Sequence, residues 1–336
     1  MLFEDLSLSK SIQKAVYEEG YTHPTPIQEQ AIPLVLSGRD VIGCAQTGTG
    51  KTAAFAIPII HQLHRIVGSS KKAKEIRALI VTPTRELAVQ IGQNFDTYAK
   101  YTNLTQITLF GGVSQIPQVD TLKKGVDVVI ATPGRLLDLH KQGFINFDHL
   151  HTLVLDEADQ MLDMGFINDV KKIVKLTPKN RQTLLFSATM PIAIRELAEM
   201  FLTDPAKVEV SPVSSTAEKV EQRIYFVEKT EKRNLLYHLI KNENLSDVLV
   251  FSRTKHGADN VVKALRKNNI AAEAIHGDKS QNARQRVLEA FKNKEVGVLV
   301  ATDIAARGID IDQLPFVINF DLPYIGRNHN PKIKIR

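Results

Sequence analysis

Five short apolar runs, each closed by turn residues, constrain the fold of this 336-residue chain more than any other feature. They read RDVIGCAQ, RALIVTPT, VDVVIATPG, HTLVLDEAD and QTLLFSAT, and helix-spaced stretches such as RELAVQIGQNFDTYAKY lie between them. The runs are continuously apolar, which is typical of strands that are buried on both faces. The sequence therefore predicts an α/β fold, with a mostly parallel sheet and helices on both of its faces.

The pattern stops at TDPAKVEVSPVSSTAEKVEQ, where Pro, Ser and Thr gather, and then begins again. The second set of runs reads QRIYFVEK, DVLVFSRTK, AAEAIHGD, VGVLVATDIAARGID and PFVINFD. RALIVTPTRELA resembles DVLVFSRTKHGA in layout, and VDVVIATPGR resembles VGVLVATDIAARG, in the same order. We predict two related lobes, 1–208 and 218–336, joined by a linker at 209–217. The alternative is a coincidence between generic strand–turn–helix units.

The composition indicates the cellular location of the protein but does not identify its binding partner. Cys44 is the single cysteine, so no internal disulfide can form and a reducing, cytoplasmic location is expected. The longest apolar run, AAFAIPII, is too short to span a bilayer, and MLFEDLSLSK has no signal-peptide layout. The formal net charge of +6 is weak evidence for nucleic acid, because much of the basic excess lies in the last ten residues.

The segment AQTGTGKT at 45–52 is the sharpest chemical signal. It follows a strand-like run and precedes a helix-like one, which is the context that a phosphate-binding loop requires. Gly48 and Gly50 let backbone N–H groups approach phosphate oxygens, Lys51 can reach the β- and γ-phosphates, and Thr52 can ligate Mg²⁺. A glycine-rich turn without a ligand is the alternative.

The segment LVLDEAD at 153–159 supplies acidic groups. Its strand would deliver Asp156 and Glu157 to the carboxyl edge of the sheet, where α/β folds bind ligands. Asp156 could hold Mg²⁺, and Glu157 could orient or deprotonate a water molecule. An acidic helix start is the alternative, but together with the upstream phosphate loop the segment predicts an NTPase.

AQTGTGKT, PTRELA, TPGR, LDEADQMLDMGF and SAT, in this order, resemble the motifs of the DEAD-box family of ATP-dependent RNA helicases. KNRQTLLFSATMP also resembles the bacterial RhlE-like subgroup. The resemblance covers residues 1 to about 323 and implies two RecA-like lobes, ATP and Mg²⁺ as cofactors, and RNA as partner.

The resemblance also implies the roles of particular positions. GYTHPTPIQ at 20–28, within an adenine-reading segment 1–29, places Gln28 on the base and Phe3 as a stacking aromatic. Without the resemblance, Phe3 would be a core residue and the two prolines a turn. Asp159 would join Lys51, Asp156 and Glu157 in catalysis. Ser187 and Thr189 would couple the ATP state to the RNA side. The remaining implied nucleotide contacts are Ala45, Gln46, Thr47, Gly48, Thr49, Gly50, Lys51, Thr52, Gly308 and Asp310.

The resemblance implies RNA contacts in both lobes. These positions would contact the sugar-phosphate backbone of the RNA, so the chain would bind RNA of any sequence. In isolation each is a strand-end turn, and His276 in AIHGD is equally well a turn histidine. The implied positions are Pro83, Arg85, Gly111, Gly112, Thr132, Pro133, Gly134, Arg135, Arg253, Gln281, Arg284 and Thr302. ATP and RNA would close the two lobes, and closure would bend one strand and open a short duplex locally.

The last residues depart from the family pattern. The family places HRIGRTGR, whose arginines assist hydrolysis by about 10³–10⁵ in rate, some way after the FDLP strand. Here YIGR follows FDLP at once, Arg327 is the one candidate remnant, and the second lobe is expected to be truncated after about residue 323. The sequence thus leaves three hypotheses: an ATP-dependent RNA helicase, an RNA clamp or hydrolysis-defective fragment, and a DNA-directed helicase.

Overall fold

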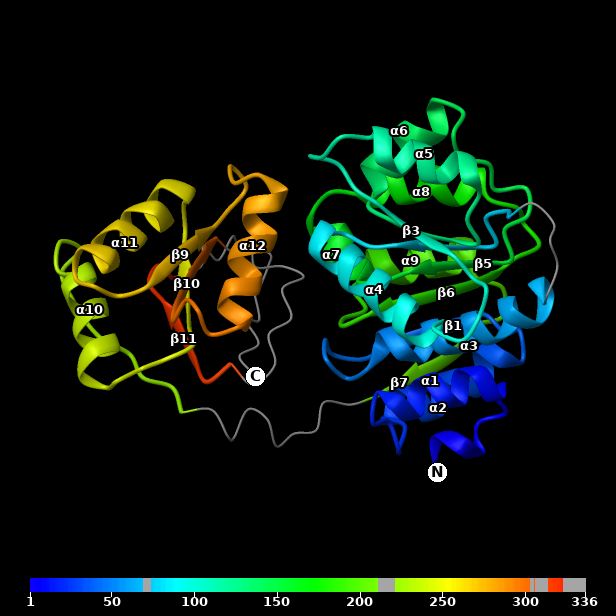
Figure 1. Ribbon diagram of the computed structural model, residues 1–336, viewed down its shortest axis with the longest axis horizontal. Coiled ribbons are helices and arrows are strands. Elements are labelled where there is room, and N and C mark those ends of the chain that lie inside the picture. Colours follow the sequence, from blue (N-terminus) through cyan, green and yellow to red (C-terminus); the bar gives the residue numbers. More distant parts are fainter. Residues whose placement is uncertain (69–73, 211–220, 303–304, 306–313, 323–336) are drawn as a thin grey trace. The chain divides into compact units, whose positions relative to one another are not determined.

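The computed structural model describes residues 1–68, 74–210, 221–302, 305 and 314–322. The chain divides into two compact units, Met1–Pro212 and Val213–Arg336, and each is considered by itself (Figure 1). Within the described residues, no helix has the length and apolar character needed to cross a membrane.

Unit 1 is built on a seven-stranded parallel sheet in the order β3-β4-β2-β5-β6-β1-β7. The predicted runs form its five central strands, and their carboxyl ends meet at one edge. The strands are β1 (Val41–Cys44), β2 (Ala78–Val81), β3 (Gln106–Leu109), β4 (Val128–Ala131), β5 (Thr152–Leu155), β6 (Gln182–Ser187) and β7 (Ala206–Glu209).

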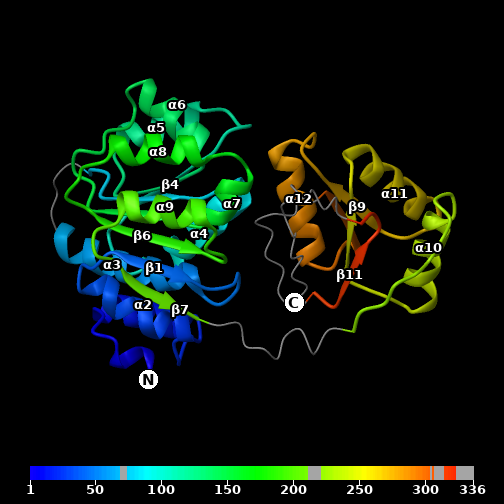
Figure 2. The same ribbon diagram turned by 180° about the vertical axis from the view of Figure 1, so that it is seen from behind.

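Helices cover both faces of this sheet, as expected for continuously apolar strands. Figure 1 shows α1–α3 on one side and α5, α6 and α8 on the other, and Figure 2 shows the same layers from behind. The helices are α1 (Lys10–Glu18), α2 (Pro26–Leu36), α3 (Lys51–Val67), α4 (Arg85–Tyr98), α5 (Ile116–Lys124), α6 (Pro133–Lys141), α7 (Ala158–Asp163), α8 (Ile167–Leu176) and α9 (Ile192–Phe201), after a short 3₁₀ turn η1 (Phe3–Asp5).

Alternate residues of each strand enter two separate cores. In β2, Ile80 packs with α1–α4, whereas Leu79 and Val81 pack with α5–α9. In β5, Val154 joins the first core and Leu153 the second. This period of two fixes the register, because a one-residue slip would exchange the two cores.

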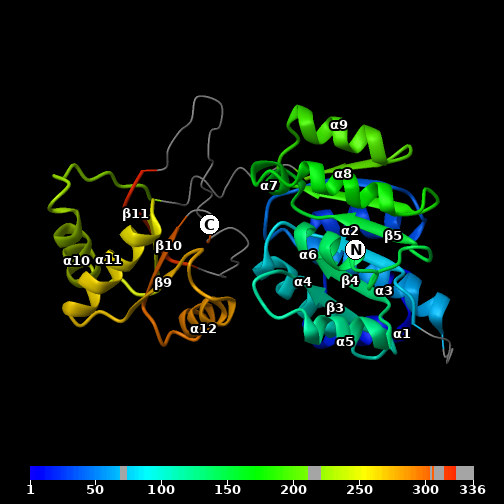
Figure 3. The same ribbon diagram turned by 90° about the horizontal axis from the view of Figure 1, so that it is seen from above.

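Unit 2 holds a four-stranded parallel sheet in the order β11-β8-β10-β9. Helices α10 and α11 pack on one face and α12 on the other (Figures 1 and 3). The elements are α10 (Lys232–Asn242), β8 (Val248–Ser252), α11 (Lys255–Lys267), β9 (Ala272–Ile275), α12 (Gln281–Lys292), β10 (Val298–Thr302) and β11 (Phe316–Asn319).

The resemblance between the two halves extends to a helix cap. Thr84 caps α4 and accepts a hydrogen bond from Leu87 N (3.2 Å), and Thr254 caps α11 and accepts one from Gly257 N (3.0 Å). Each threonine follows a strand and begins a helix in the same way. This correspondence supports two related lobes.

Three expectations need comment. The strand expected in QRIYFVEK is wrong: residues 221–228 form neither helix nor strand, and Phe226 is 98% exposed. Glu209, the first residue of the expected linker, still belongs to β7, and most of 209–217 lies outside the described residues. The predicted loss of pattern after Pro323 likewise falls on residues 323–336, outside the described part of the chain.

Candidate active site at the carboxyl edge of the sheets

The predicted phosphate loop connects β1 to α3. Gly48 and Gly50 have φ angles of +74° and +91°, which is left-handed backbone that favours glycine. A side chain at Gly50 would also collide with the Gln28 amide. Lys51 begins α3 and is only 6% exposed, and its Nζ donates to the Ala45 carbonyl at 2.9 Å. The loop therefore buries the Lys51 side chain and binds its amino group through the Ala45 carbonyl.

The segment before α2 holds this loop from the outside. Gln28 Nε2 donates to the Gly50 carbonyl (3.1 Å), and Thr25 Oγ1 donates to the Thr49 carbonyl (2.7 Å). Gln28 Oε1 accepts from Thr25 N (2.9 Å), which completes a capping box at the start of α2. Sequence reasoning missed Thr25, although the spacing Thr-x-x-Gln signals such a box.

Phe3 lies in the core of unit 1. It is 5% exposed, and its ring stacks on Tyr21 with a centroid distance of 5.9 Å. The backbone N–H of Phe3 donates to the Thr22 carbonyl (3.1 Å), which ties η1 to the segment before α2. These contacts fit the alternative of a core residue, the stacking on adenine stays a prediction, and Tyr21 is a neighbour that the sequence did not indicate.

Asp156 and Glu157 follow β5 and are 2% and 4% exposed. Asp156 Oδ1 and Glu157 Oε2 are buried without a hydrogen-bond partner among the described residues. Burial raises the pKa of Asp156 to about 6, against the nearby charge of Lys51, and burial together with Asp156 raises the pKa of Glu157 to about 7. Unpaired buried carboxylate oxygens are costly without a partner, so the pair suits a divalent cation.

Glu157 also connects the acidic segment with the phosphate loop. Its backbone is left-handed (φ 51°, ψ 52°), an uncommon conformation for a residue with a side chain, and it begins α7. Thr47 Oγ1 lies 3.5 Å from Glu157 Oε1. No cluster of three or more His, Cys, Asp or Glu ligands is found among the described residues. A cation here would therefore need further oxygens, as Mg²⁺ usually takes from phosphates and water.

Asp159 is turned toward the segment after β6. Its Oδ2 accepts from Thr189 N (2.9 Å) and from Thr189 Oγ1 (2.8 Å). Ser187 Oγ accepts from Asp159 N (3.2 Å) and donates to the Thr189 carbonyl (2.8 Å). The predicted catalytic role of Asp159 stays a prediction, and its contacts favour a link between the acidic segment and 187–189.

The predicted RNA-facing residues of unit 1 gather at the same carboxyl edge. Arg85 begins α4 after β2, and its guanidinium lies over Gly112, whose φ is +80°. Arg135 Nη2 donates to the Val113 carbonyl at 3.0 Å. The other predicted positions lie where strands of this sheet end or helices begin: Pro83 before α4, Gly111 after β3, and Thr132, Pro133 and Gly134 at the start of α6. Two helix N-termini and two arginines suit phosphate groups.

In unit 2, Arg253 follows β8 and is held by the end of β11. Its backbone N donates to Asp321 Oδ2 (3.1 Å), and its Nη2 donates to the Leu322 carbonyl (3.2 Å). Asp321 also accepts from Lys232 Nζ (3.1 Å) and Ser252 Oγ (3.3 Å). Sequence reasoning missed Asp321, because its role depends on strands that are distant in sequence.

The remaining predicted positions of unit 2 lie near the start of α12 and the end of β10. Gln281 is 3% exposed, Arg284 Nη2 lies 3.5 Å from the Ala305 carbonyl, and Thr302 ends β10. His276 is 3% exposed with its Nε2 3.1 Å from Asp259 Oδ1, which fits the structural alternative. The predicted positions Gly308, Asp310 and Arg327 lie outside the described residues.

Comparison with known protein families gives two matches. The DEAD/DEAH box helicase family matches residues 25–197, and the Helicase conserved C-terminal domain matches residues 231–333. Together these matches include the described residues of both predicted sites except Phe3, which precedes the first matched range.

Curated relatives agree with the family matches. "DEAD-box ATP-dependent RNA helicase RhpA" of Helicobacter pylori is 45% identical over 321 residues, which are 96% of this chain and 64% of that protein. "DEAD-box ATP-dependent RNA helicase CshA" of Geobacillus kaustophilus is 43% identical over 321 residues, 96% of this chain and 68% of the relative. "ATP-dependent RNA helicase DeaD" of Buchnera aphidicola is 43% identical over 322 residues and only 52% of its length is matched.

Solved structures show the same architecture. A DEAD box protein from Methanococcus jannaschii has a TM-score of 0.58 and 39% identity, over 96% of this chain and 86% of its own. S. cerevisiae Dbp5, bound to Gle1 and IP6, has a TM-score of 0.74 and 28% identity, over 97% of this chain and 81% of its own. The two predicted RecA-like lobes are confirmed by these structures, while the RhlE-like subgroup stays a prediction. This chain belongs to the DEAD-box family of ATP-dependent RNA helicases.

Proposed function

We propose that this chain couples ATP binding and hydrolysis to the local opening of short RNA duplexes. The observation that carries the proposal is the meeting of Lys51, Asp156 and Glu157 at one sheet edge. Lys51, the predicted phosphate-binding lysine, lies close enough there for its charge to act on two buried carboxylates, each with an oxygen that has no partner among the described residues. The curated relatives are named ATP-dependent RNA helicases, which supports the same chemistry here.

In this proposal each group has a distinct task. Backbone N–H groups of the phosphate loop and Lys51 bind the ATP phosphates. Thr52 and Asp156 would hold Mg²⁺, whose positive charge would favour hydrolysis of the bound phosphates. Glu157 accepts the proton of the attacking water, for which a pKa near 7 is suitable.

RNA would be bound through its backbone. In unit 1, Arg85, Arg135 and the N-termini of α4 and α6 offer positive charge and N–H donors, which recognise phosphates without reading bases. In unit 2 we assign Arg253, Gln281, Arg284 and Thr302 to the same task, and Gly308 and Asp310 to ATP. Ser187 and Thr189 would pass the ATP state to the RNA-binding loops. The cytoplasmic location and the linker at 209–217 stay predictions.

The alternative of an RNA clamp without turnover is not favoured by the comparisons, since the relatives are named as helicases. A strand-separation assay tests the proposal, with a short RNA duplex and the matched DNA duplex as substrates. ATP-dependent release of the RNA strand is expected, and it should be lost in Arg85→Ala. Equal opening of the DNA duplex would favour a DNA-directed helicase, and RNA binding without strand release would favour the clamp.

A further inference from the structure

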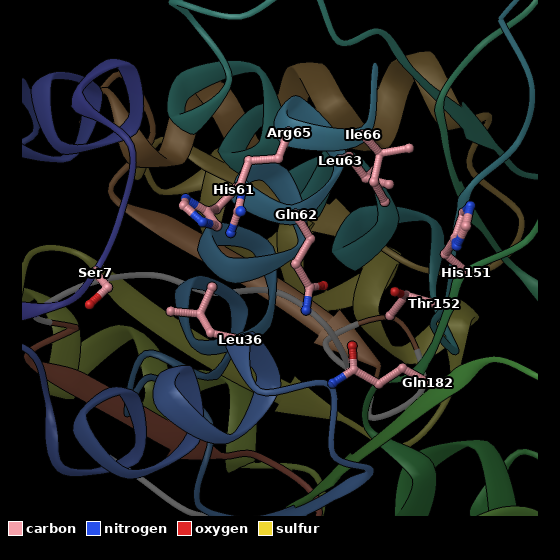
Figure 4. Close-up of a pocket in the computed structure, with 10 residues that line it drawn as sticks. All are labelled: Ser7, Leu36, His61, Gln62, Leu63, Arg65, Ile66, His151, Thr152 and Gln182. Atoms are coloured by element: carbon pink, nitrogen blue, oxygen red, sulfur yellow. The ribbon is translucent and has the colours of Figure 1, made fainter. Parts of the chain in front are cut away.

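A cavity of about 670 Å³ lies at the amino edge of the unit 1 sheet, away from the phosphate loop (Figure 4). It is lined by the last residue of α2, the last turns of α3, and the first residues of β5 and β6. The 17-residue helix α3 begins at Lys51 and reaches this cavity only at its far end. A helix of that length spans about 25 Å, so the cavity is separate from the nucleotide site.

The polar atoms of the cavity are held in place by backbone carbonyls. Gln62 Nε2 donates to the Val35 carbonyl at 2.7 Å. Gln182 Nε2 donates to the same carbonyl at 2.9 Å and to the Arg39 carbonyl at 2.7 Å. Both amide groups reach into the space that Figure 4 shows. No donor to either Oε1 atom is found among the described residues, so both oxygens can accept hydrogen bonds from N–H donors of a ligand.

The opposite side of the cavity offers groups for an anion. None of its ten lining residues is Asp or Glu, and the described residues contain no ion-pair partner of Arg65. His61 Nδ1 accepts a hydrogen bond from Ser9 N at 3.0 Å, and burial lowers the pKa of His61. The neutral ring therefore carries its proton on Nε2, as a donor. A guanidinium and an imidazole N–H together suit a phosphate or carboxylate.

Leu36, Leu63 and Ile66 supply the apolar part of the lining. Leu63 is 1% exposed and belongs to the core, so Leu36 and Ile66 offer the surface against which a flat ring can pack. The volume lies within the range of about 300–1,000 Å³ that is usual for small-molecule sites.

We propose that this cavity binds a small anion that carries a planar heteroaromatic ring with N–H donors, of the size of a nucleoside monophosphate. The anion lies against Arg65 and His61, and the ring lies on Leu36 and Ile66 with its N–H groups toward Gln62 and Gln182. The site does not depend on the residues that bind ATP.

Calorimetric titration of the full chain with CMP tests the proposal, because cytosine carries an amino donor and lacks the adenine that the first site is expected to read. CMP should bind, and Arg65→Ala should weaken binding at least about tenfold, the usual effect of losing a charge-assisted hydrogen bond. Ile66→Trp should block binding by filling the cavity. Arg195→Ala, which removes an exposed arginine of α9 outside the cavity, should bind CMP like the unaltered chain.

Lys51→Ala separates this proposal from the proposed function. This substitution should abolish ATP binding and leave CMP binding unchanged. The proposal for the cavity and the proposal for the ATP site are therefore tested independently. The proposal is overturned if CMP does not bind at millimolar concentration, or if Lys51→Ala abolishes CMP binding. Equal CMP affinity in Arg65→Ala, Ile66→Trp and the unaltered chain would overturn it as well.

Discussion

At the scale of single residues, Glu157 of the candidate active site has two features that lower the stability of the folded chain. Its carboxylate is buried with one oxygen that has no partner in the described part of the chain, and its backbone is left-handed. Such features are costly in the folded state and are typical of functional sites. Burial also raises the pKa of Glu157 to about 7, because the charged carboxylate is less stable in the folded chain than in water.

The first prediction concerns pH and stability. The pKa of Glu157 rises from 4.5 to about 7 on folding, so at intermediate pH the folded state keeps a proton that the unfolded chain has lost. The free energy of unfolding should therefore fall as pH rises through this window. Without divalent cations, Glu157→Gln should stabilise the chain by about 1–3 kcal/mol at pH 8 and by little at pH 4.

Thermal unfolding of both forms at the two pH values measures this difference. Glu199→Gln, at an exposed position of α9, is the matched control and should change Tm equally at both pH values. An equal effect of Glu157→Gln at pH 4 and pH 8 would contradict the assigned burial of this carboxylate.

The second prediction concerns Asp159, which holds both donors of Thr189. Asp159→Ala should free the segment 187–189 from α7. We expect RNA strand separation to fall at least about tenfold, while the Kd for ATP changes less than about threefold, because the lost contacts lie between elements. Parallel unwinding and nucleotide-binding assays measure the two effects, with the exposed Asp120→Ala as control. A comparable loss of ATP binding would instead place Asp159 among the nucleotide-binding groups.

At the scale of elements, the start of α2 holds the phosphate loop through hydrogen bonds from Thr25 and Gln28. Thr25 caps the helix and also donates to the Thr49 carbonyl. Thr25→Val should lower the free energy of unfolding by about 1 kcal/mol, the usual cost of a lost cap, and should weaken ATP binding. Thr25→Ser keeps the hydroxyl and should restore both properties. Denaturant unfolding measures the stability and nucleotide titration measures the ATP affinity of both variants. Normal ATP affinity in Thr25→Val would show that the phosphate loop does not need the Thr25 hydroxyl.

Elements also show what the sequence could predict. Central strands such as β2 and β5 are recognisable because both of their faces are apolar, and the turns after them carry the predicted site residues. Strand β3 has alternating burial, and β7 lies in a Pro- and Ser-rich region, so neither was expected. QRIYFVEK looks like a strand, but strand formation requires a neighbouring edge, and this segment pairs with no strand in the described part of unit 2. Thr25 and Asp321 act through tertiary contacts that local patterns do not contain.

At the scale of the whole molecule, the two units should differ in local stability. Among the described strands of unit 2, β11 lies at the edge of the sheet and pairs only with β8, and Phe316 is 39% exposed. Strand β5 lies inside the unit 1 sheet, between β2 and β6, and is buried throughout. Amide hydrogens of β11 should therefore exchange at least about tenfold faster than those of β5. Hydrogen exchange followed by mass spectrometry measures both peptides, and equal protection would contradict this difference.

The central claim is that the phosphate loop and the acidic segment form an ATPase site that RNA controls. Steady-state ATP hydrolysis by the 336-residue chain, with and without single-stranded RNA, tests it most directly beside Lys51→Ala. The account predicts hydrolysis that RNA stimulates and that Lys51→Ala abolishes. ATP binding without hydrolysis in either condition, or hydrolysis that persists in Lys51→Ala, would contradict it.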